Sequence, residues 1–253
     1  MVGNIYIVGM GPGDRSMMTE EAFLAMERAD VIVGYTVYID LVREYFADKE
    51  FFTTPMKAEI ERCKACFDFA LKGKDVAFIC SGDAGVYGMA APVFELLPQY
   101  KALSPELSAD NIYVIAGVTA ALSGAAVLGA PINHDFCVIS LSDLLTPWEV
   151  IEKRLRAAIM GDFAIVLYNP SSKKRHDYLK RACDIMLAAG ATGERACGYV
   201  ENIGREGTAS HVCSLSELLD AQVNMFTTVF IGNSKSQIIE GKLVTKRGYK
   251  IYE

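Results

Sequence analysis

The sequence has no surplus of basic residues. Its 25 lysines and arginines are outnumbered by 31 aspartates and glutamates, which gives a formal net charge of −6 over 253 residues. Nucleic-acid binding depends on neutralising phosphates with lysine and arginine, so this charge argues against a nucleic-acid partner. Local basic groups remain available for a small anionic ligand.

The marks of secretion and of membrane insertion are also missing. No basic segment precedes the first apolar run at residues 5–8, so no leader is expected. The seven cysteines are odd in number and scattered, which is typical of buried free thiols in a reducing compartment. Residues 112–132 carry no charge, but their three glycines and one proline favour a strand, a loop and a packed helix over a membrane span. We expect a cytoplasmic protein with no membrane partner.

Two kinds of catalytic centre find no support in the sequence. Cys63-x-x-Cys66 lies in a helical pattern without a second cysteine pair at zinc spacing, so packing thiols are favoured over a metal or redox site. No Ser-His-Asp or Cys-His constellation is visible around the three histidines. We therefore expect no resident metal and no protein nucleophile.

Apolar runs alternate with helical patterns along the chain. Buried strands are predicted for residues 5–8, 31–33, 76–80 and 112–115. After Gly129-Ala130-Pro131 the pattern restarts, with helices predicted at 148–160 and 178–189 and strands at 136–141, 163–168, 196–200 and 227–231. This alternation is typical of a largely parallel sheet covered on both faces. We predict two α/β domains, residues 1–131 and 132–253.

Three predicted strands of the first domain end in glycine-containing loops. These loops are residues 9–14, 81–89 and 116–119. Because parallel strands share one carboxyl edge, the loops are expected to converge on one ligand site. The first loop lacks the last glycine of the G-x-G-x-x-G fingerprint, and Pro12 removes an N–H group, which disfavours an NAD-type dehydrogenase.

Taken together and in order, these motifs resemble the tetrapyrrole methylase family, which uses S-adenosylmethionine (SAM). The resemblance spans essentially the whole chain and rests first on Gly9-x-Gly11-Pro12-Gly13-Asp14, Thr19-x-x-Ala22, Ser81-Gly82-Asp83-x-x-x-Tyr87-Gly88 and Gly117-Val118-Thr119-Ala120. Further motifs resemble the branch that methylates carbon 17 of a precorrin-3B-type macrocycle, with ring contraction, in cobalamin biosynthesis: Gly34-Tyr35-x-x-Tyr38, residues 140–148, Tyr168-Asn169-Pro170-Ser171, residues 202–206 and residues 245–249. One departure is Ala116, which stands where the family often has proline.

The resemblance implies two α/β domains with the tetrapyrrole methylase fold and a SAM site in the cleft between them. Carried over by position, the SAM-binding residues are Gly11, Pro12, Gly82, Asp83, Val86, Met89, Thr119, Ala120, Tyr168, Asn202 and Thr227. S-adenosylhomocysteine is the expected product of the cofactor. Family members are typically homodimers, so a homodimer is expected here.

The expected chemistry needs no protein nucleophile, because an electron-rich carbon of the macrocycle attacks the sulfonium methyl group directly. Ring contraction calls for a general acid or base, for which the sequence offers Asp83, Asp143, Glu206 and His134 without choosing among them. The substrate carries many carboxylates, so basic side chains are expected to bind it. The candidates are Arg15, Lys57, Arg62, Lys153, Arg175 and Arg205, of which Arg205 is preferred because it lies in a glycine-flanked loop.

Several alternatives stay open at the level of sequence. Family members also methylate other tetrapyrrole positions, ribosomal RNA, or diphthamide on a protein. The negative charge disfavours an RNA substrate. A non-catalytic SAM-binding module is compatible with the residues, and the substrate is compatible with either a cobalt-containing or a metal-free macrocycle.

Overall fold

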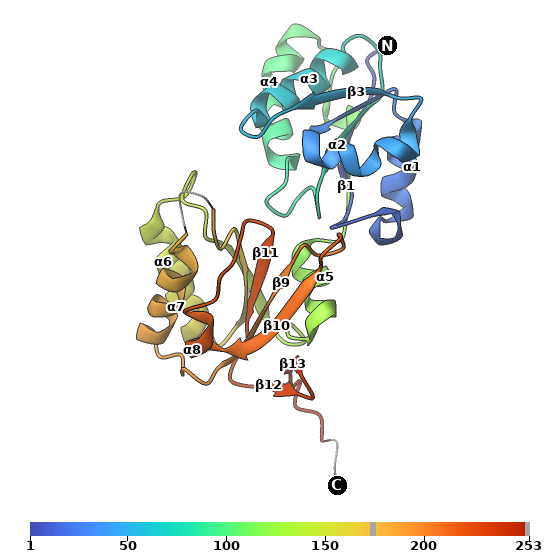
Figure 1. The fold of residues 1–253 in the computed structure, drawn as a ribbon. Helices are drawn as coiled ribbons and strands as arrows, with labels where there is room; N and C mark the ends of the chain where they lie inside the picture. Colours follow the sequence, from blue (N-terminus) through green and yellow to red (C-terminus); the bar gives the residue numbers. More distant parts are fainter. Residues whose placement is uncertain (173–175, 251–253) are drawn as a thin grey trace. The chain divides into compact units, whose positions relative to one another are not determined.

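The computed structural model describes residues 1–172 and 176–250, and the chain divides into two compact units, Met1–Thr119 and Ala120–Glu253 (Figure 1). The division therefore falls before the boundary expected after Pro131. The reason is the helix α5 (Ala120–Leu128), which packs against the strands of the second unit. The short strand β6 (Gly129–Ala130) also pairs within that unit, with β13 (Lys242–Thr245).

The first unit contains a five-stranded sheet in the order β3-β2-β4-β1-β5, and every neighbouring pair is parallel. The strands are β1 (Ile5–Gly9), β2 (Val31–Tyr35), β3 (Glu50–Thr54), β4 (Val76–Cys80) and β5 (Ile112–Ile115). The parallel sheet expected from the apolar runs is confirmed for this unit. Only β3 was not among the predicted strands, because Glu50 and two threonines interrupt its apolar character.

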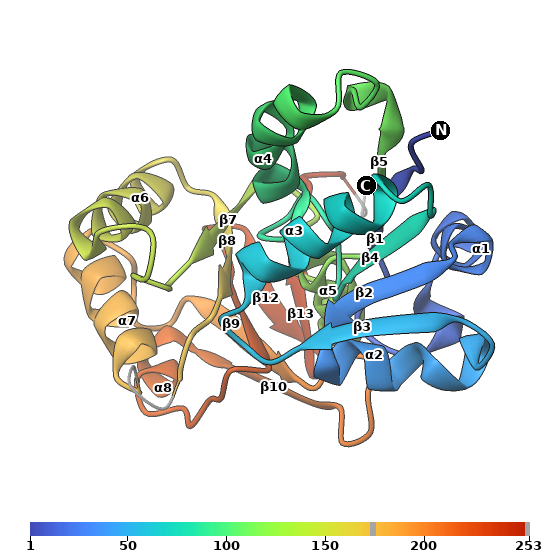
Figure 2. The same cartoon turned by 90° about the horizontal axis from the view of Figure 1, so that it is seen from above.

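Helices cover both faces of this sheet (Figure 2). Helices α1 (Glu20–Arg28) and α2 (Thr36–Val42) pack on one face, while α3 (Glu59–Ala70) and α4 (Ala90–Leu103) pack on the other. Short 3-10 turns lie at Arg15–Met17, Arg43–Phe46 and Ala109–Asn111. The neighbouring strands β1 and β4 are thus followed by helices on opposite faces. Such a switch point opens a crevice at the carboxyl ends of the strands, where ligands of α/β sheets bind.

The second unit has a mixed sheet in the order β10-β9-β11-β8-β7. Its strands are β7 (Phe136–Ser140), β8 (Ala164–Tyr168), β9 (Ala196–Glu201), β10 (Ala209–Ser214) and β11 (Thr227–Ile231). Only β7 and β8 pair in parallel, and β11 runs antiparallel to both of its neighbours. The expected largely parallel arrangement is therefore wrong for this unit. After β9 the chain returns through a tight turn into β10 rather than through a crossover helix, so direction reverses.

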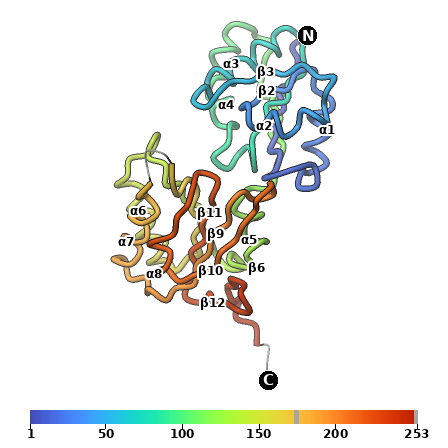
Figure 3. Tube along the Cα trace, in the orientation of Figure 1, coloured from blue at the N-terminus to red at the C-terminus, as the bar shows by residue number. Residues whose placement is uncertain are grey.

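Helices also cover both faces of the second sheet (Figure 3). One face carries α6 (Trp148–Met160), α7 (Tyr178–Ala188) and the short α8 (Leu215–Leu218), and the other carries α5. A small sheet of β12 (Ser236–Ile239), β13 and β6 completes the unit. Across the described residues, no helix combines the length and hydropathy that a membrane span requires. The charge-free stretch 112–132 forms the strand, loop and packed helix that its composition predicted.

The cysteines are free thiols, as the sequence predicted. Cys63 and Cys66 lie in α3 and are buried in the core of the first unit, so the Cys-x-x-Cys spacing reflects helical packing. Burial raises the pKa of Cys63 to about 11 and that of Cys80 to about 12. These thiols stay protonated and unreactive at neutral pH.

Candidate functional site

The glycine-containing loops of the first unit meet through their backbones. The Gly11 N–H donates to the Gly82 carbonyl at 3.0 Å, and the Gly82 N–H donates to the Gly11 carbonyl at 2.8 Å. The Thr19 hydroxyl, which also caps α1, donates to the Ala116 carbonyl at 3.2 Å. The predicted convergence of the three loops on one edge is confirmed.

Glycine is required in these loops because the backbones approach too closely for a side chain. A Cβ atom at Gly9 would lie 2.7 Å from the Gly117 nitrogen and 2.9 Å from the Gly82 carbonyl oxygen. A Cβ atom at Gly117 would come closer still to the carbonyl oxygens of Gly9 and Gly82. Glycine at these positions therefore lets the loops pack backbone against backbone at the carboxyl edge of the sheet.

Asp83 holds two of the loops together. Its Oδ1 accepts hydrogen bonds from the Gly85 and Val86 N–H groups at 2.8 and 3.1 Å, and its Oδ2 accepts one from the Gly117 N–H at 2.9 Å. Hydrogen bonds to an ionised carboxylate are stronger than neutral ones. Both oxygens of Asp83 are thus engaged with backbone, which is the arrangement of a structural clamp rather than of a free general base.

The start of the first loop is also built from local contacts. Asp14 Oδ1 accepts hydrogen bonds from the Ser16 N–H at 2.9 Å and from its hydroxyl at 2.6 Å, and these bonds lower the pKa of Asp14. Arg15 forms an ion pair with Glu20, and its guanidinium lies 4.1 Å from the centroid of the Phe23 ring. Arg15 would therefore have to exchange these partners to bind a substrate carboxylate.

In the second unit, the predicted site residues gather at one edge of the sheet. Tyr168 ends β8, Asn202 follows β9, and Thr227 begins the antiparallel β11, where it lies opposite Glu201. The Tyr168 hydroxyl accepts a hydrogen bond at 2.8 Å from the N–H of Ala121, at the start of α5. The buried Thr227 hydroxyl accepts one from the Asn224 N–H at 3.1 Å.

The turn between β9 and β10 carries two more predicted residues, Arg205 and Glu206. Thr208 closes this turn by donating its hydroxyl to the carbonyl groups of Asn202 and Arg205, both at 2.7 Å. Asn202 has a left-handed backbone with φ of 50°. The Arg205 guanidinium lies 5.7 Å from the centroid of the exposed Phe226 ring, and Glu206 is exposed. Phe226 could not be predicted from the sequence, since only the fold brings it beside Arg205.

The structure does not bring His134 to this edge. His134 precedes β7, and it is the other end of β7, at Ser140, that pairs with Tyr168. A strand of five residues is about 16 Å long, so His134 and Glu206 lie at opposite ends of the sheet. The His134 Nδ1 accepts a hydrogen bond from its neighbour Asp135. Asp143 follows β7 at the nearer end and accepts a hydrogen bond from the Tyr178 hydroxyl at 2.5 Å.

The other basic candidates have different surroundings. Lys57 follows β3 at the carboxyl edge of the first sheet, is exposed, and has a left-handed backbone with φ of 72°. Arg62 is only 5% exposed, which argues against its direct contact with a substrate. Lys153 lies in α6, and Arg175 falls outside the described residues.

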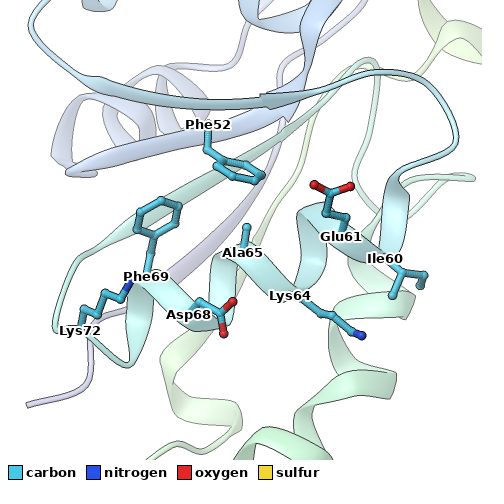
Figure 4. Close-up of a pocket in the computed structure, with 8 residues that line it drawn as sticks. All are labelled: Phe52, Ile60, Glu61, Lys64, Ala65, Asp68, Phe69 and Lys72. Atoms are coloured by element: carbon cyan, nitrogen blue, oxygen red, sulfur yellow. The ribbon is translucent and has the colours of Figure 1, made fainter.

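A pocket of about 500 Å³ lies elsewhere on the first unit, along α3 and β3 (Figure 4). The Phe52 and Phe69 rings meet edge to face in it, with centroids 5.9 Å apart, and Lys64, Asp68 and Lys72 border it. None of the predicted site residues lines this pocket. Within the described residues, no group of three or more His, Cys, Asp or Glu side chains is arranged to hold a metal ion.

Comparison with known proteins places these features in a family. Residues 4–219 match the family described as Tetrapyrrole (Corrin/Porphyrin) Methylases. The chain is 44% identical over 245 residues to a probable cobalt-factor III C(17)-methyltransferase of Salmonella typhimurium, covering 97% of this chain and 99% of that protein. It is 36% identical to a precorrin-3B C(17)-methyltransferase of a Sinorhizobium species, covering 95% of this chain and 92% of that one.

Solved structures agree with the sequence comparison. The crystal structure of the methyltransferase CobJ matches with a TM-score of 0.86 at 34% identity, covering 96% of this chain and all of that one. A uroporphyrin-III C-methyltransferase from Thermus thermophilus, complexed with S-adenosylhomocysteine, shares the fold with a TM-score of 0.71 at 19% identity. The glycine loops, the two α/β units and these likenesses along nearly the whole chain lead to one conclusion: the protein is an enzyme of the tetrapyrrole methylase family.

Proposed function

We propose that this protein transfers a methyl group from SAM to carbon 17 of a precorrin-3B-type macrocycle, in the step of cobalamin biosynthesis that contracts the ring. The observation that carries the proposal is the identity of 44% with a C(17)-methyltransferase over nearly the full length of both chains. A second relative with the same position specificity, at 36% identity, supports it. The resemblance of residues 140–148, 202–206 and 245–249 to this branch points the same way.

The loops of the first unit are suited to SAM because they present backbone groups at a switch point of a parallel sheet. A Cβ atom at Gly9 or Gly117 would fill the space where these loops meet. When bound, SAM supplies an electrophilic methyl group. We assign its binding to the residues that the family resemblance carried over: Gly11, Pro12, Gly82, Val86, Met89, Thr119 and Ala120, with Tyr168, Asn202 and Thr227 from the second unit. Asp83 keeps the loops in place.

The macrocycle combines an apolar ring system with many carboxylates, and the second unit offers a matching pair of groups. The exposed Phe226 ring provides an apolar surface, and the neighbouring Arg205 provides a fork for a carboxylate. Lys57 provides a second cation in the first unit. Glu206 is the candidate for proton transfer during ring contraction, because it is exposed and lies one residue from Arg205.

The oligomeric state and the compartment of the enzyme are a separate part of the proposal. A homodimer in the cytoplasm is proposed from the resemblance to the family. Sedimentation of the purified protein tests the dimer, and a single species with the mass of one chain would contradict it.

A product mass spectrum tests the reaction. The purified protein is incubated with SAM and, in parallel, with cobalt-factor III and with metal-free precorrin-3B. A gain of one methyl group on one of them supports the proposal and tells which macrocycle the enzyme accepts. If SAM binds but neither macrocycle is methylated, the enzyme acts on another acceptor or is a binding module. A Gly117→Ala variant serves as the control for background methylation.

A further inference from the structure

Helix α3 carries a buried arginine that the proposed chemistry does not use. The side chain of Arg62 is only 6% exposed. Arginine is almost never buried unless it is paired, because desolvating a guanidinium is costly. The position of its partners therefore indicates what this side chain does.

Arg62 reaches the carboxyl ends of β2 and β3. Its Nη1 donates hydrogen bonds to the Thr54 hydroxyl at 2.6 Å and to the Pro55 carbonyl at 3.0 Å. Its guanidinium carbon lies 6.0 Å from the centroid of the Tyr35 ring, where β2 ends. Its Nη2 lies 3.4 Å from Glu59 Oε1. These contacts are made with the strand ends, with the turn that leads into α3 and with Glu59, the first residue of α3.

Glu59 connects Arg62 to Lys57. The Glu59 Oε1 atom accepts a hydrogen bond from the Lys57 N–H at 3.2 Å and faces Arg62 on its other side. Lys57 has a left-handed backbone, which costs a residue other than glycine about 1 to 2 kcal/mol. Such a conformation persists only when its surroundings hold it in place. The hydrogen bond between Arg62 and Pro55 and the one between the Lys57 N–H and Glu59 hold the turn in place at both ends.

The turn lies at the ligand edge of the first sheet. β2 and β3 are parallel to β4 and β1, so their carboxyl ends face the same edge as the loops at Gly9 and Asp83. The Lys57 ammonium forms no ion pair with any residue that the structure describes, since Glu59 is directed to its backbone and to Arg62. A positive charge is thus left available at this edge.

We propose that Arg62 is a positioning residue for substrate binding: it fixes the turn of residues 54–59 so that the Lys57 ammonium meets a carboxylate of the macrocycle. This inference rests on the proposed function. It replaces the expectation that Arg62 itself contacts the substrate. It also explains the left-handed backbone of Lys57, which sets the direction of the lysine side chain.

Steady-state kinetics with the macrocycle that the enzyme accepts test the inference. Lys57→Asn removes the charge but tolerates the left-handed backbone. It should raise the KM for the macrocycle about tenfold, the effect of losing one charge-assisted contact, with the KM for SAM and the Tm unchanged. Arg62→Met should raise the same KM by a similar factor, and Arg62→Lys should recover part of the loss.

The combined variant separates positioning from direct contact. If Arg62 acts through Lys57, then Arg62→Met adds little to the effect of Lys57→Asn, because both changes remove the same interaction. Should Arg62→Met fold poorly, Thr54→Val removes one of the acceptors of Arg62 and should raise the macrocycle KM by a smaller factor. Arg156→Met is the matched control, because Arg156 pairs with Glu152 on the surface of α6 in the second unit, whereas the turn of residues 54–59 belongs to the first.

Two results would overturn the inference. One is a lower Tm in Arg62→Met and Thr54→Val with an unchanged macrocycle KM, which would make the role of Arg62 purely structural. The other is a combined variant whose effects multiply in full, which would make Arg62 and Lys57 independent. Failure of the proposed function shows itself differently, because the wild-type enzyme would then leave both macrocycles unmethylated.

Discussion

The two units of this enzyme build the edges that carry their predicted ligand-binding residues in different ways. In the first unit, the edge consists of backbone pressed against backbone at Gly9, Gly82 and Gly117. In the second unit, it consists of side-chain hydroxyl groups, such as those of Tyr168 and Thr227, that accept hydrogen bonds from nearby backbone. The first arrangement has no room for an added atom, whereas the second can lose one hydrogen bond at a time.

This difference predicts how each edge responds to mutation. Contacts between backbones are lost together, because the main chain cannot rotate away from an added atom as a side chain does. Hydrogen bonds from side chains are individually worth about 0.5 to 1.5 kcal/mol and are lost singly. Substitutions that press on backbone should therefore have larger effects than substitutions that remove one side-chain hydrogen bond.

Gly117→Ala should have the largest effect. The new methyl group would press on the carbonyl oxygens of Gly9 and Gly82, so at least two loops would have to move. Overpacking of this kind costs about 3 kcal/mol or more when backbone must shift. We expect a large fall in the free energy of unfolding measured in urea, together with loss of SAM binding by calorimetry.

Gly190→Ala provides the control for this substitution. Gly190 has a positive φ of 101° but open space around its Cβ position, so only the conformational cost of about 1 to 2 kcal/mol applies. It should leave SAM affinity unchanged. Equal losses of stability in the two variants would show that steric contact at Gly117 is unimportant and would remove the basis of the comparison.

Asp83→Asn should have the next largest effect. The new amide can still accept from Gly85 and Val86, but its NH₂ group would face the Gly117 N–H, donor against donor. Loss of one hydrogen bond to a charged group is worth about 2 kcal/mol, or roughly a thirtyfold weaker SAM affinity by calorimetry. Asp83→Ala should weaken SAM binding further while the protein remains folded.

Asp110→Asn is the matched control for Asp83. Asp110 is exposed near Ser108, and its charge touches none of the three loops. Its substitution should leave SAM affinity unchanged. An unaltered affinity in both Asp83 variants would contradict the clamp.

The sequence predicted the first unit well because its signals are local. An apolar strand followed by a glycine loop is visible in a single stretch of chain, and parallel strands place such loops on one edge. The direction of β11 could not be predicted this way. A buried strand has the same apolar character whether its neighbours run parallel or antiparallel, so only the connections decide.

The predicted site residues also differ in whether their roles depend on nearby sequence or on the fold. Asp83 was identified by its glycine neighbours, but its role as a clamp depends on Gly117, which is distant in the sequence. In the sequence, Arg62 resembles a surface cation in a helical pattern. Only the fold, which packs α3 against the end of β3 at Thr54, shows that it is buried. His134 was chosen for its chemistry, and the direction of β7 sets it at the far end of the sheet.

Tyr168→Phe should produce a modest change in the second unit. It removes the acceptor for the Ala121 N–H at the first turn of α5, where backbone donors have no partner within the helix. We expect a loss of about 1 kcal/mol in the free energy of unfolding and a small decrease in SAM affinity. Tyr113→Phe, on the exposed edge strand β5, is the control and should change neither quantity. A loss of stability as large as that of Gly117→Ala would mean that the contacts at the second edge are also lost together.

The smallest effect at neutral pH concerns the cores, where the two units are alike. Burial raises the pKa of Cys80 in the first unit and of Cys183 in the second to about 12. An unfolded thiol ionises near pH 9, so the folded state keeps its protons where the unfolded state loses them. Stability from these thiols is therefore complete below about pH 9 and falls as the pH rises toward about 12.

Urea unfolding of the wild type at about pH 8 and about pH 10.5 measures this slope, and the single variants Cys80→Ala and Cys183→Ala should each reduce it by a similar amount. Similar reductions would show that the difference between the two edges does not extend into the buried thiols of the cores. A slope that responds to Cys80 alone would extend the difference between the units from their edges into their interiors.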